Sequence, residues 1–385
     1  MSTIPCEPPI PGQMLRPSKI IVWDPFVRLF HWLLVACVLV AFATSLILPI
    51  TWLGWHLLAG LVALALVTGR VVWGLLGSTY ARFSAFLRTP RALLAHLNEL
   101  QRGRAHRHLG HNPLGGAMIL TLIALLVSIG VTGALALGGA FKIGPFAYAT
   151  SFVAGRTAWT IHQLLAYALL GLILLHIAGA IYESRRTKEN LVRAMLDGRK
   201  EARREDVTAP ARRPNPGLAA SIVAIVLLGA AVVVSIMTGW PALGVPNQPL
   251  DKAYVQECGA CHVAYHPSLL AAATWGAIMD GLANHFGENA ELEPATARSI
   301  RAYLAANAAE HYDTLPAHVF LTQNPADPLR ITATPFWGRR HASIPPTVFS
   351  SMTVGNGGQC DACHQDASTG RFSPLSIVIP HGSIQ

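Results

Sequence analysis

The sequence contains few charged residues for its length. Asp, Glu, Lys and Arg make up 13% of the 385 residues, whereas a soluble domain carries about 25%. Apolar residues make up 52%, and the mean hydropathy is +0.41. This composition excludes an ordinary soluble protein. Five windows are long and apolar enough to cross about 30 Å of hydrocarbon, and they run roughly over 29–50, 52–76, 115–137, 159–181 and 218–240.

A cleavable secretory signal is also missing. Residues 1–20 are rich in proline and contain no apolar core, so we expect the first window to be an uncleaved anchor. Lys and Arg number three before the first window, six in 78–113 and ten in 183–213, but none between the first two windows and two in 138–158. Cytoplasmic connections carry the excess of Lys and Arg. The N-terminus is therefore predicted inside the cell and residues 241–385 outside the membrane.

The basic excess does not require nucleic acid as a partner. The formal net charge is +9, but most of it belongs to connections that are predicted to face anionic lipid. Residues 241–385 hold seven Lys or Arg and eleven Asp or Glu, which gives them a net charge of −4. We therefore expect membrane lipid, and no nucleic acid, among the partners.

Cysteine is scarce as well, and four of the six cysteines fall in two short motifs. Each motif is C-x-x-C-H, the attachment signature of a c-type haem. The two thiols add to the haem vinyl groups, and the histidine becomes the first axial ligand of the iron. A disulfide and a zinc-binding cysteine pair are the alternatives. The predicted attachment residues are Cys258, Cys261, His262, Cys360, Cys363 and His364.

The two haem motifs also fix a compartment. Bacteria attach c-type haem outside the cytoplasmic membrane, so residues 241–385 are expected in the periplasm. The distribution of Lys and Arg gives the same side independently. We therefore predict a multi-pass protein of the bacterial inner membrane, with a cytoplasmic N-terminus and a periplasmic C-terminal domain.

Four histidines lie within the predicted spans. His162 and His176 are fourteen residues apart, so they share one helix face and lie about 21 Å apart along its axis. By depth, His56 pairs with His162 near the outer surface, and His31 pairs with His176 near the inner surface. An imidazole inside a span is costly and usually functional, so we expect each pair to ligate one non-covalent b haem. Arg70 is predicted to meet a propionate of the inner haem, with snorkelling to the inner headgroups as the alternative.

The predicted fold class is all-α, in four parts. Residues 1–182 form a membrane bundle of four helices that holds two b haems. Residues 183–217 form a basic cytoplasmic connector, and 218–240 form a fifth transmembrane helix that acts as a tether. Residues 241–385 form a mainly α, loop-rich domain with two c haems. Shorter helices are expected at 191–196, 268–286 and 293–309.

Other histidines and cysteines of the membrane part have no predicted role. Those of the loop between the second and third windows are expected in solvent or at the membrane interface. The two remaining cysteines are expected to be inert. The residues are His96, His106 and His108, expected in solvent, His111, expected at the interface, and Cys6 and Cys37.

Four segments of residues 20–185 carry a family likeness. They are Trp23-Asp24-Pro25-Phe26-Val27-Arg28-Leu29-Phe30-His31-Trp32, His56 with Gly60, Gly69-Arg70-Val71-Val72-Trp73-Gly74, and His162 with His176. They resemble bacterial cytochrome b-561, which includes the b-type subunits of nickel–iron hydrogenases. The resemblance implies four helices, two non-covalent b haems and electron exchange with quinones.

Residues of the C-terminal part carry a second likeness. They are Cys258–Tyr265, Trp275, Met279, His285-Phe286-Gly287, Arg330-Ile331-Thr332, Thr334-Pro335-Phe336-Trp337, His341 and Cys360–His364. They resemble periplasmic dihaem cytochrome c over about 250–380, which implies two c haems that each have two histidine ligands. The fusion of both parts in one chain departs from family members that are separate proteins.

The resemblance favours His285 and His341 as the second ligands. His285 closes a predicted helix that is able to fold over the first haem, and His341 precedes the second motif by a stretch long enough to reach the far side of its haem. His266 follows His262 by four residues and is not expected to reach the opposite face. The alternatives are His266, His311, His318, His381 and Met279.

Together these features predict an electron conduit, with no catalytic residue assigned. Electrons from the quinol pool would pass through the b haems to the first c haem, then the second, then a soluble periplasmic electron-transfer protein. One alternative is a terminal haem reductase or oxidase acting on oxygen, superoxide, peroxide or a nitrogen oxide. Another is a haem redox sensor. Whether the chain is an enzyme, for example a quinol:cytochrome oxidoreductase, stays open.

Overall fold

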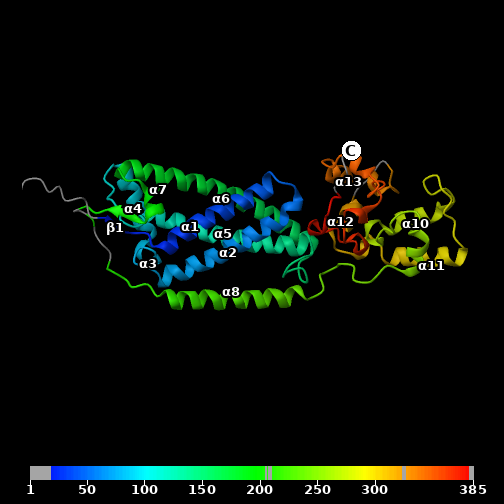
Figure 1. The fold of residues 1–385 in the computed structure, drawn as a ribbon, viewed down its shortest axis with the longest axis horizontal. Helices are drawn as coiled ribbons and strands as arrows, with labels where there is room; N and C mark the ends of the chain where they lie inside the picture. The colour runs from blue at the N-terminus through cyan, green and yellow to red at the C-terminus, as the bar shows by residue number, and fades with distance from the viewer. Residues whose placement is uncertain (1–18, 204–205, 207–209, 323–326, 381–385) are drawn as a thin grey trace, which may run out of the picture. The chain divides into compact units, whose positions relative to one another are not determined.

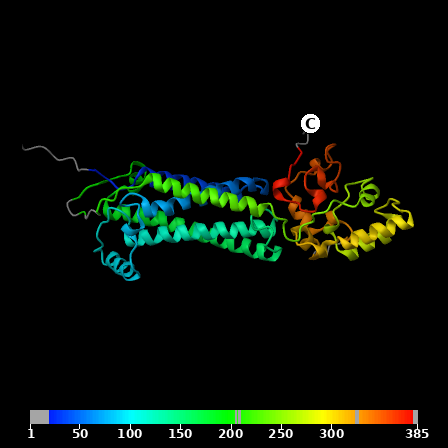
Figure 2. The ribbon, with the colours of Figure 1, turned by 90° about the horizontal axis from the view of Figure 1, so that it is seen from below.

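The computed structural model describes residues 19–203, 206, 210–322 and 327–380. Among them, five helices are long and apolar enough to cross a membrane, which confirms the five predicted windows. The described residues are 64% helical, so the all-α fold class is confirmed. Helices α1, α2, α5 and α6 run side by side (Figures 1 and 2). The five helices are α1 (Pro25–Leu46), α2 (Leu53–Leu76), α5 (Pro113–Ala140), α6 (Phe152–Thr187) and α8 (Pro216–Thr238).

Helix α6 is longer than its predicted window. Its 36 residues extend over about 54 Å, which exceeds the thickness of the hydrocarbon layer. The last turns are polar, and Arg186 anchors them by donating to both carboxylate oxygens of Glu183 and to the backbone oxygen of Ala105. Hydropathy finds only the apolar part of such a helix, so the sequence predicted a shorter one.

By its internal contacts the chain divides into two compact units. Each of the five long helices contributes one segment to each unit. The first unit comprises Met1–Val38, Val62–Val127 and Tyr167–Leu227, and the second comprises Leu39–Leu61, Ser128–Ala166 and Leu228–Gln385.

In the first unit, Asp24 fixes the start of α1. Its carboxylate accepts the backbone N–H of Val27 at 2.9 Å, and Pro25 at the first helical position has no N–H to satisfy. The other carboxylate oxygen accepts Nε1–H of Trp73 at 2.9 Å and the hydroxyl of Ser78 at 2.5 Å. The Trp-Asp-Pro segment therefore ties the start of α1 to the end of α2.

A two-stranded sheet also belongs to the first unit. Strand β1 (Lys19–Ile21) pairs antiparallel with β2 (Arg199–Glu201), a pairing that no local sequence pattern predicted. Nearby, Arg107 donates to the carboxylates of Glu189 and Asp206, so the polar end of this unit is held by buried ion pairs. The shorter helices are α3 (Phe83–Phe86), α4 (Pro90–Gln101) and α7 (Leu191–Asp197), the last of which confirms the helix predicted at 191–196.

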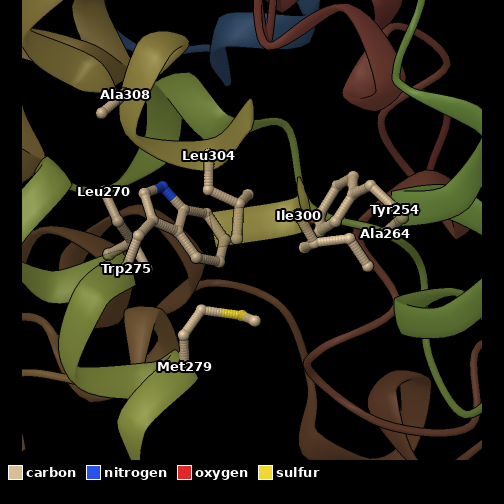
Figure 3. Packing of buried hydrophobic residues seen from close by; sticks show 8 residues of the cluster. All are labelled: Tyr254, Ala264, Leu270, Trp275, Met279, Ile300, Leu304 and Ala308. Atoms are coloured by element: carbon tan, nitrogen blue, oxygen red, sulfur yellow. The ribbon is translucent and has the colours of Figure 1, made fainter. Parts of the chain in front are cut away.

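The second unit contains a helical domain that follows α8. Helix α10 (Ala272–Asp280) packs on α11 (Pro294–Ala306). Between them Ile300 is fully buried, and burying a side chain of this size contributes about 1.5–3 kcal/mol. The buried indole of Trp275 donates Nε1–H to the backbone oxygen of Pro267 at 2.8 Å. The core residues are Tyr254, Ala264, Leu270, Trp275, Met279, Ile300, Leu304 and Ala308 (Figure 3).

Short helices and turns make up most of the rest of this domain, as the frequent prolines predicted. The helices α10 and α11 are each shorter than the stretches predicted at 268–286 and 293–309. The other helices are α9 (Lys252–Cys258), α12 (Leu315–Thr322), α13 (Pro335–His341) and α14 (Pro346–Phe349). The 3-10 turns of this unit are η1 (Ile50–Trp52), η2 (Pro267–Leu269), η3 (Leu282–Asn284), η4 (Ala309–His311), η5 (Ile331–Ala333), η6 (Cys360–Ala362), η7 (Ala367–Thr369) and η8 (Pro374–Ser376).

Within the second unit, the loop between α5 and α6 is bonded to this helical domain. Lys142 Nζ donates to Asp313 Oδ2 at 2.7 Å and to the backbone oxygen of Thr150 at 3.0 Å. Asp313 Oδ2 also accepts the backbone N–H of Phe152 at 2.8 Å, and Asp313 Oδ1 lies 2.8 Å from Nε2 of His318. One carboxylate thus joins the start of α6 to the segment around η4 and α12.

Candidate haem sites

The first site lies in the second unit, between α2 and α6. The ring centres of His56 and His162 are 6.1 Å apart. Nδ1 of His56 lies 3.1 Å from the backbone oxygen of Ala41, and Nδ1 of His162 lies 3.0 Å from that of Ile129. In each ring a hydrogen on Nδ1 is donated to the backbone oxygen. Nε2 of each ring therefore keeps its lone pair for a metal. A Cβ at Gly133 would lie 3.1 Å from the His162 ring, so this position leaves little room for a side chain.

The spacing of these rings fits two ligands on opposite sides of one iron. A metal–imidazole bond is about 2.0 Å long and the ring centre lies about 1.15 Å beyond the nitrogen, so two axial rings have centres about 6.3 Å apart. The separation of the His56 and His162 rings lies within a few tenths of an ångström of this value. The donor set is therefore suited to a bis-histidine haem.

The second candidate site, in the first unit, contains His31, His176 and Arg70. His31 and His176 are close enough to interact electrostatically. Arg70 is 3% exposed, and its guanidinium lies 5.2 Å from the ring centre of Phe83. Buried Nδ1 of His31 and buried Nη1 of Arg70 have no hydrogen-bond partner among the described residues. Buried polar atoms of this kind are normally satisfied, and a haem with its anionic propionates offers the missing acceptors.

The third and fourth sites lie in the helical domain of the second unit, and each includes one C-x-x-C-H motif. The ring centres of His262 and His285 are 6.2 Å apart, and those of His341 and His364 are also 6.2 Å apart. Both values match the axial spacing of about 6.3 Å. The structure thus brings together the two pairs that the resemblance implied.

Hydrogen bonds and aromatic rings hold two of these imidazoles. Nδ1 of His262 lies 2.8 Å from the backbone oxygen of Val263, and Nδ1 of His341 lies 2.9 Å from that of Trp337. Tyr265 stacks on His262 with ring centres 5.0 Å apart, and Trp337 stacks on His341 at 4.4 Å. Each ring therefore has a fixed orientation, with Nε2 as the atom left to bind a metal.

Burial keeps the partner imidazoles in their metal-binding form. Burial lowers the pKa of His285 and of His364 below the ordinary histidine value, and the neighbouring imidazole adds to the effect in each case. A neutral imidazole is the form that binds a metal. A backbone bridge between His285 and Glu288 fixes the turn that carries the first of these ligands.

The four motif cysteines are not paired with one another in disulfides. None of the five cysteines in the described part of the chain forms a disulfide. The described residues also contain no group of three or more His, Cys, Asp or Glu side chains placed to hold a metal ion. Four thiols available for thioether bonds agree with the haem motifs better than with the disulfide or zinc alternatives.

The alternative second ligands are engaged elsewhere or lie apart from the motifs. Nδ1 of His266 lies 2.8 Å from the hydroxyl of Ser268 and caps η2. Met279 is packed in the core between α10 and α11 (Figure 3). His318 is bound to Asp313, and His311 is exposed. His381, like Cys6, lies outside the described residues.

The two haem motifs are joined to each other by hydrogen bonds. Tyr265 donates its hydroxyl hydrogen to the backbone oxygen of Gly358 at 2.8 Å. The backbone N–H of Val263 donates to Oε1 of Gln359 at 3.3 Å. The segment that follows the first motif therefore lies directly against the segment that precedes the second.

Two histidines of the first unit make contacts that the sequence did not predict. His96 was expected in solvent but is 3% exposed, because α4 turns its histidine inward, and this prediction was wrong. His111 packs between Trp23 and Phe86, with ring centres 4.5 and 5.0 Å away. Burial, with Arg70 nearby, lowers the pKa of His111 to about 3. Apolar periodicity gave no signal for either contact, since both depend on residues distant in sequence.

Five spanning helices, membrane imidazoles on three of them and two haem motifs define a membrane-bound haem cytochrome. The family profile of prokaryotic cytochrome b561 matches residues 22–198, and that of dihaem cytochrome c matches residues 254–372. The chain belongs to the dihaem cytochrome c family through its C-terminal part, which is joined to a membrane part of the cytochrome b561 family. It is an integral membrane electron-transfer cytochrome that carries two b haems and two c haems.

Solved structures of dihaem cytochromes c are similar to the C-terminal part. A dihaem cytochrome c from Rhodobacter sphaeroides is 38% identical, with 31% of this chain and 95% of that chain covered and a TM-score of 0.25. A dihaem cytochrome c from Shewanella baltica is 36% identical, with 35% and 96% covered and a TM-score of 0.28. A search of curated proteins found no match.

Proposed function

We propose that this cytochrome transfers electrons from membrane quinol to a soluble periplasmic protein. The observation that carries the proposal is the recurrence of one imidazole spacing, 6.1 to 6.2 Å, in three histidine pairs. One pair lies between spanning helices and two lie in the domain with the attachment motifs. The haems supply iron that accepts and releases one electron, and the protein supplies position, ligands and potential.

Named residues have proposed roles at each site. His31 with His176, and His56 with His162, are the axial ligands of the two b haems. His262 with His285, and His364 with His341, are those of the c haems. Cys258, Cys261, Cys360 and Cys363 form the thioether bonds, and Arg70 pairs with a propionate at the inner site.

The orientation in the membrane follows from the distribution of charge. The segments at 78–113 and 183–213 carry most Lys and Arg between spans, so we place them in the cytoplasm of a bacterial inner membrane. The domain at 241–385 then lies in the periplasm, where c-type haem is attached. The corresponding parts are a membrane domain (1–182), a connector (183–217), a fifth spanning helix (218–240) and this periplasmic domain.

Contacts of the second unit favour the second c site as the first to receive electrons. Turn η1, four residues before His56, packs against η8. Segment 376–378 next to η8 is bonded to the second motif: Gln365 N–H donates to the oxygen of Ser376 at 2.9 Å, and Val378 N–H donates to that of Cys363 at 2.8 Å. We therefore reverse the order expected from the sequence, so that electrons reach His341 and His364 before His262 and His285.

The paired imidazoles also disfavour a terminal oxidase or reductase. Such an enzyme needs an iron with an open or labile position. At both c sites a second imidazole stands at the axial spacing, so neither position is open. Carbon monoxide should therefore leave the spectrum of the reduced wild-type protein unchanged.

The proposal is tested by following electrons from quinol to an acceptor. The purified, haem-loaded protein is reduced with a quinol in detergent and mixed with fractionated periplasmic proteins in a stopped-flow spectrometer. Oxidation of the c haems should accelerate in proportion to the concentration of one soluble redox protein. If quinol reduces no haem, or only small oxidants reoxidise the c haems, the proposed donor and acceptor are wrong.

A further inference from the structure

A second kind of histidine pair lies outside the four haem sites, in the first unit. His96 belongs to α4, and His108 lies in the loop that follows. The side chain of His96 is 4% exposed. Nε2 of His96 and Nδ1 of His108 are buried, and neither has a hydrogen-bond partner in the described part of the chain. A buried nitrogen without a partner is rare in a native protein and calls for an explanation.

The spacing of this pair differs from that of the haem pairs. The ring centres of His96 and His108 are 5.4 Å apart and the rings are nearly perpendicular, at 88°. Two imidazoles on opposite sides of one iron have ring centres about 6.3 Å apart, whereas two ligands at the tetrahedral angle on one metal have centres about 5.2 Å apart. The pair therefore fits neighbouring positions on a tetrahedral ion rather than the axial positions of a haem.

Both imidazoles of this pair are in the neutral form that binds a metal. Burial lowers the pKa of both imidazoles, so they are neutral and able to donate lone pairs. The carboxylate of Glu183 interacts electrostatically with both rings, and that of Glu99 lies 3.8 Å from Nδ1 of His96. The guanidinium groups of Arg186, which is bound to Glu183, and of Arg88 oppose these carboxylates. Two carboxylates thus face two guanidinium groups, so the neutral, unpartnered imidazole nitrogens, rather than a net charge, carry the affinity for a metal ion.

The geometry points to a binding site for a divalent transition metal such as Zn2+ between Nε2 of His96 and Nδ1 of His108. Two protein nitrogens supply half of a tetrahedral set, and water completes it, with the Glu183 carboxylate adding negative charge. Such a site is weaker than a structural zinc site with four protein ligands, so it responds to the metal concentration. Glu183 follows His176 by two helical turns on α6, so the site lies on the helix that also carries haem ligands.

Zinc stoichiometry tests the site directly. The full-length, haem-loaded protein, purified without a polyhistidine tag, is dialysed against Zn2+ and analysed for zinc per chain. The wild type should bind one zinc ion more than His96→Gln and His108→Gln. His106→Gln is the matched control, because His106 is exposed in the same loop and its replacement should leave the stoichiometry at the wild-type value. Unchanged haem spectra establish that each variant is folded.

X-ray absorption at the zinc edge tests the wild type without any variant. One equivalent of zinc should show two imidazole nitrogens at about 2.0 Å together with lighter oxygen neighbours. Equal zinc binding by the wild type and His96→Gln would overturn the inference. So would a zinc spectrum without imidazole scattering. Neither result bears on the haem ligands, so the two proposals fail independently.

Discussion

Replacing Asp313 by Asn should destabilise the haem c domain, because its carboxylate is the partner of a buried ammonium. Its carboxylate bonds Lys142, Phe152 and His318 at 2.7 to 2.8 Å. The side chain of Lys142 is 3% exposed and that of Asp313 is 24% exposed. Lys142 also has a left-handed backbone, with φ at 56°, which is unfavourable for a side chain with a Cβ. In Asp313→Asn the buried ammonium would lose the opposite charge of Asp313 and would keep only neutral acceptors, such as the backbone oxygen of Thr150.

The magnitude follows from the burial of the pair. Removing one partner of a buried ion pair costs about 3–5 kcal/mol. Because Asp313 is partly exposed and Lys142 keeps neutral acceptors, we expect about 3 kcal/mol, at the lower end. With a urea dependence of about 2 kcal/mol per molar, the unfolding midpoint should fall by about 1.5 M. The assay is urea unfolding of the full-length protein, followed by the c-haem Soret band.

The effect should also depend on pH. Burial alone would raise the pKa of Asp313, but hydrogen bonds from Lys142, His318 and Phe152 outweigh it and hold the pKa below the ordinary value. A carboxyl group with a lower pKa in the folded state stabilises the protein above its unfolded pKa of about 3.9, and this contribution disappears as the pH falls through the folded value. Wild type and Asp313→Asn should therefore differ at neutral pH and converge in strong acid.

Asp280→Asn is the matched control. Asp280 pairs with Arg301, but the two side chains are 72% and 42% exposed. An exposed ion pair contributes at most about 1 kcal/mol, so the midpoint should move by less than about 0.5 M. Equal shifts for the two variants would refute the reasoning, since they would show that the burial of Lys142 does not matter.

Three further predictions concern the haems. Acid–acetone extraction should remove about half of the haem, because only the two c haems are held by thioether bonds, and retention of all of it would contradict the b-haem assignment. His162→Ala should lose the outer b haem, since its iron loses an axial ligand, while the c haems still assemble. A spectrum with both b haems intact would show that His56 and His162 are not the pair. His341→Ala should give a high-spin second c haem that binds carbon monoxide but stays attached through Cys360 and Cys363. An unchanged low-spin EPR signal in this variant would point to another ligand. A methionine–iron charge-transfer band in the wild type would instead assign Met279 to the first c haem.

Local sequence patterns predicted the spanning helices and the paired histidines for a physical reason. A window of apolar residues is sufficient to mark a membrane span, and helix periodicity places His162 and His176 on one face. Depth alone then paired His56 with His162, and the structure brings these rings to 6.1 Å. The C-x-x-C-H motifs are likewise local, because all their chemistry lies within five residues.

Contacts between distant segments were not predictable in the same way. The bond between Lys142 and Asp313 joins residues 171 positions apart, and neither residue belongs to a recognisable motif. The stacking of Trp337 on His341 was missed, although both were part of the family likeness. His96 was expected in solvent because its loop is rich in Arg, whereas the structure buries it beside His108.

Quinol-driven reduction of the c haems is the most direct test of electron transfer through the membrane part. The full-length wild type and His162→Ala are mixed with the same quinol in a stopped-flow spectrometer, and the α band of the c haems is followed. The account predicts that the wild type reduces its c haems through the b haems, and that His162→Ala, with intact c haems, does so at least tenfold more slowly. Equal rates of c-haem reduction in the two proteins would contradict it.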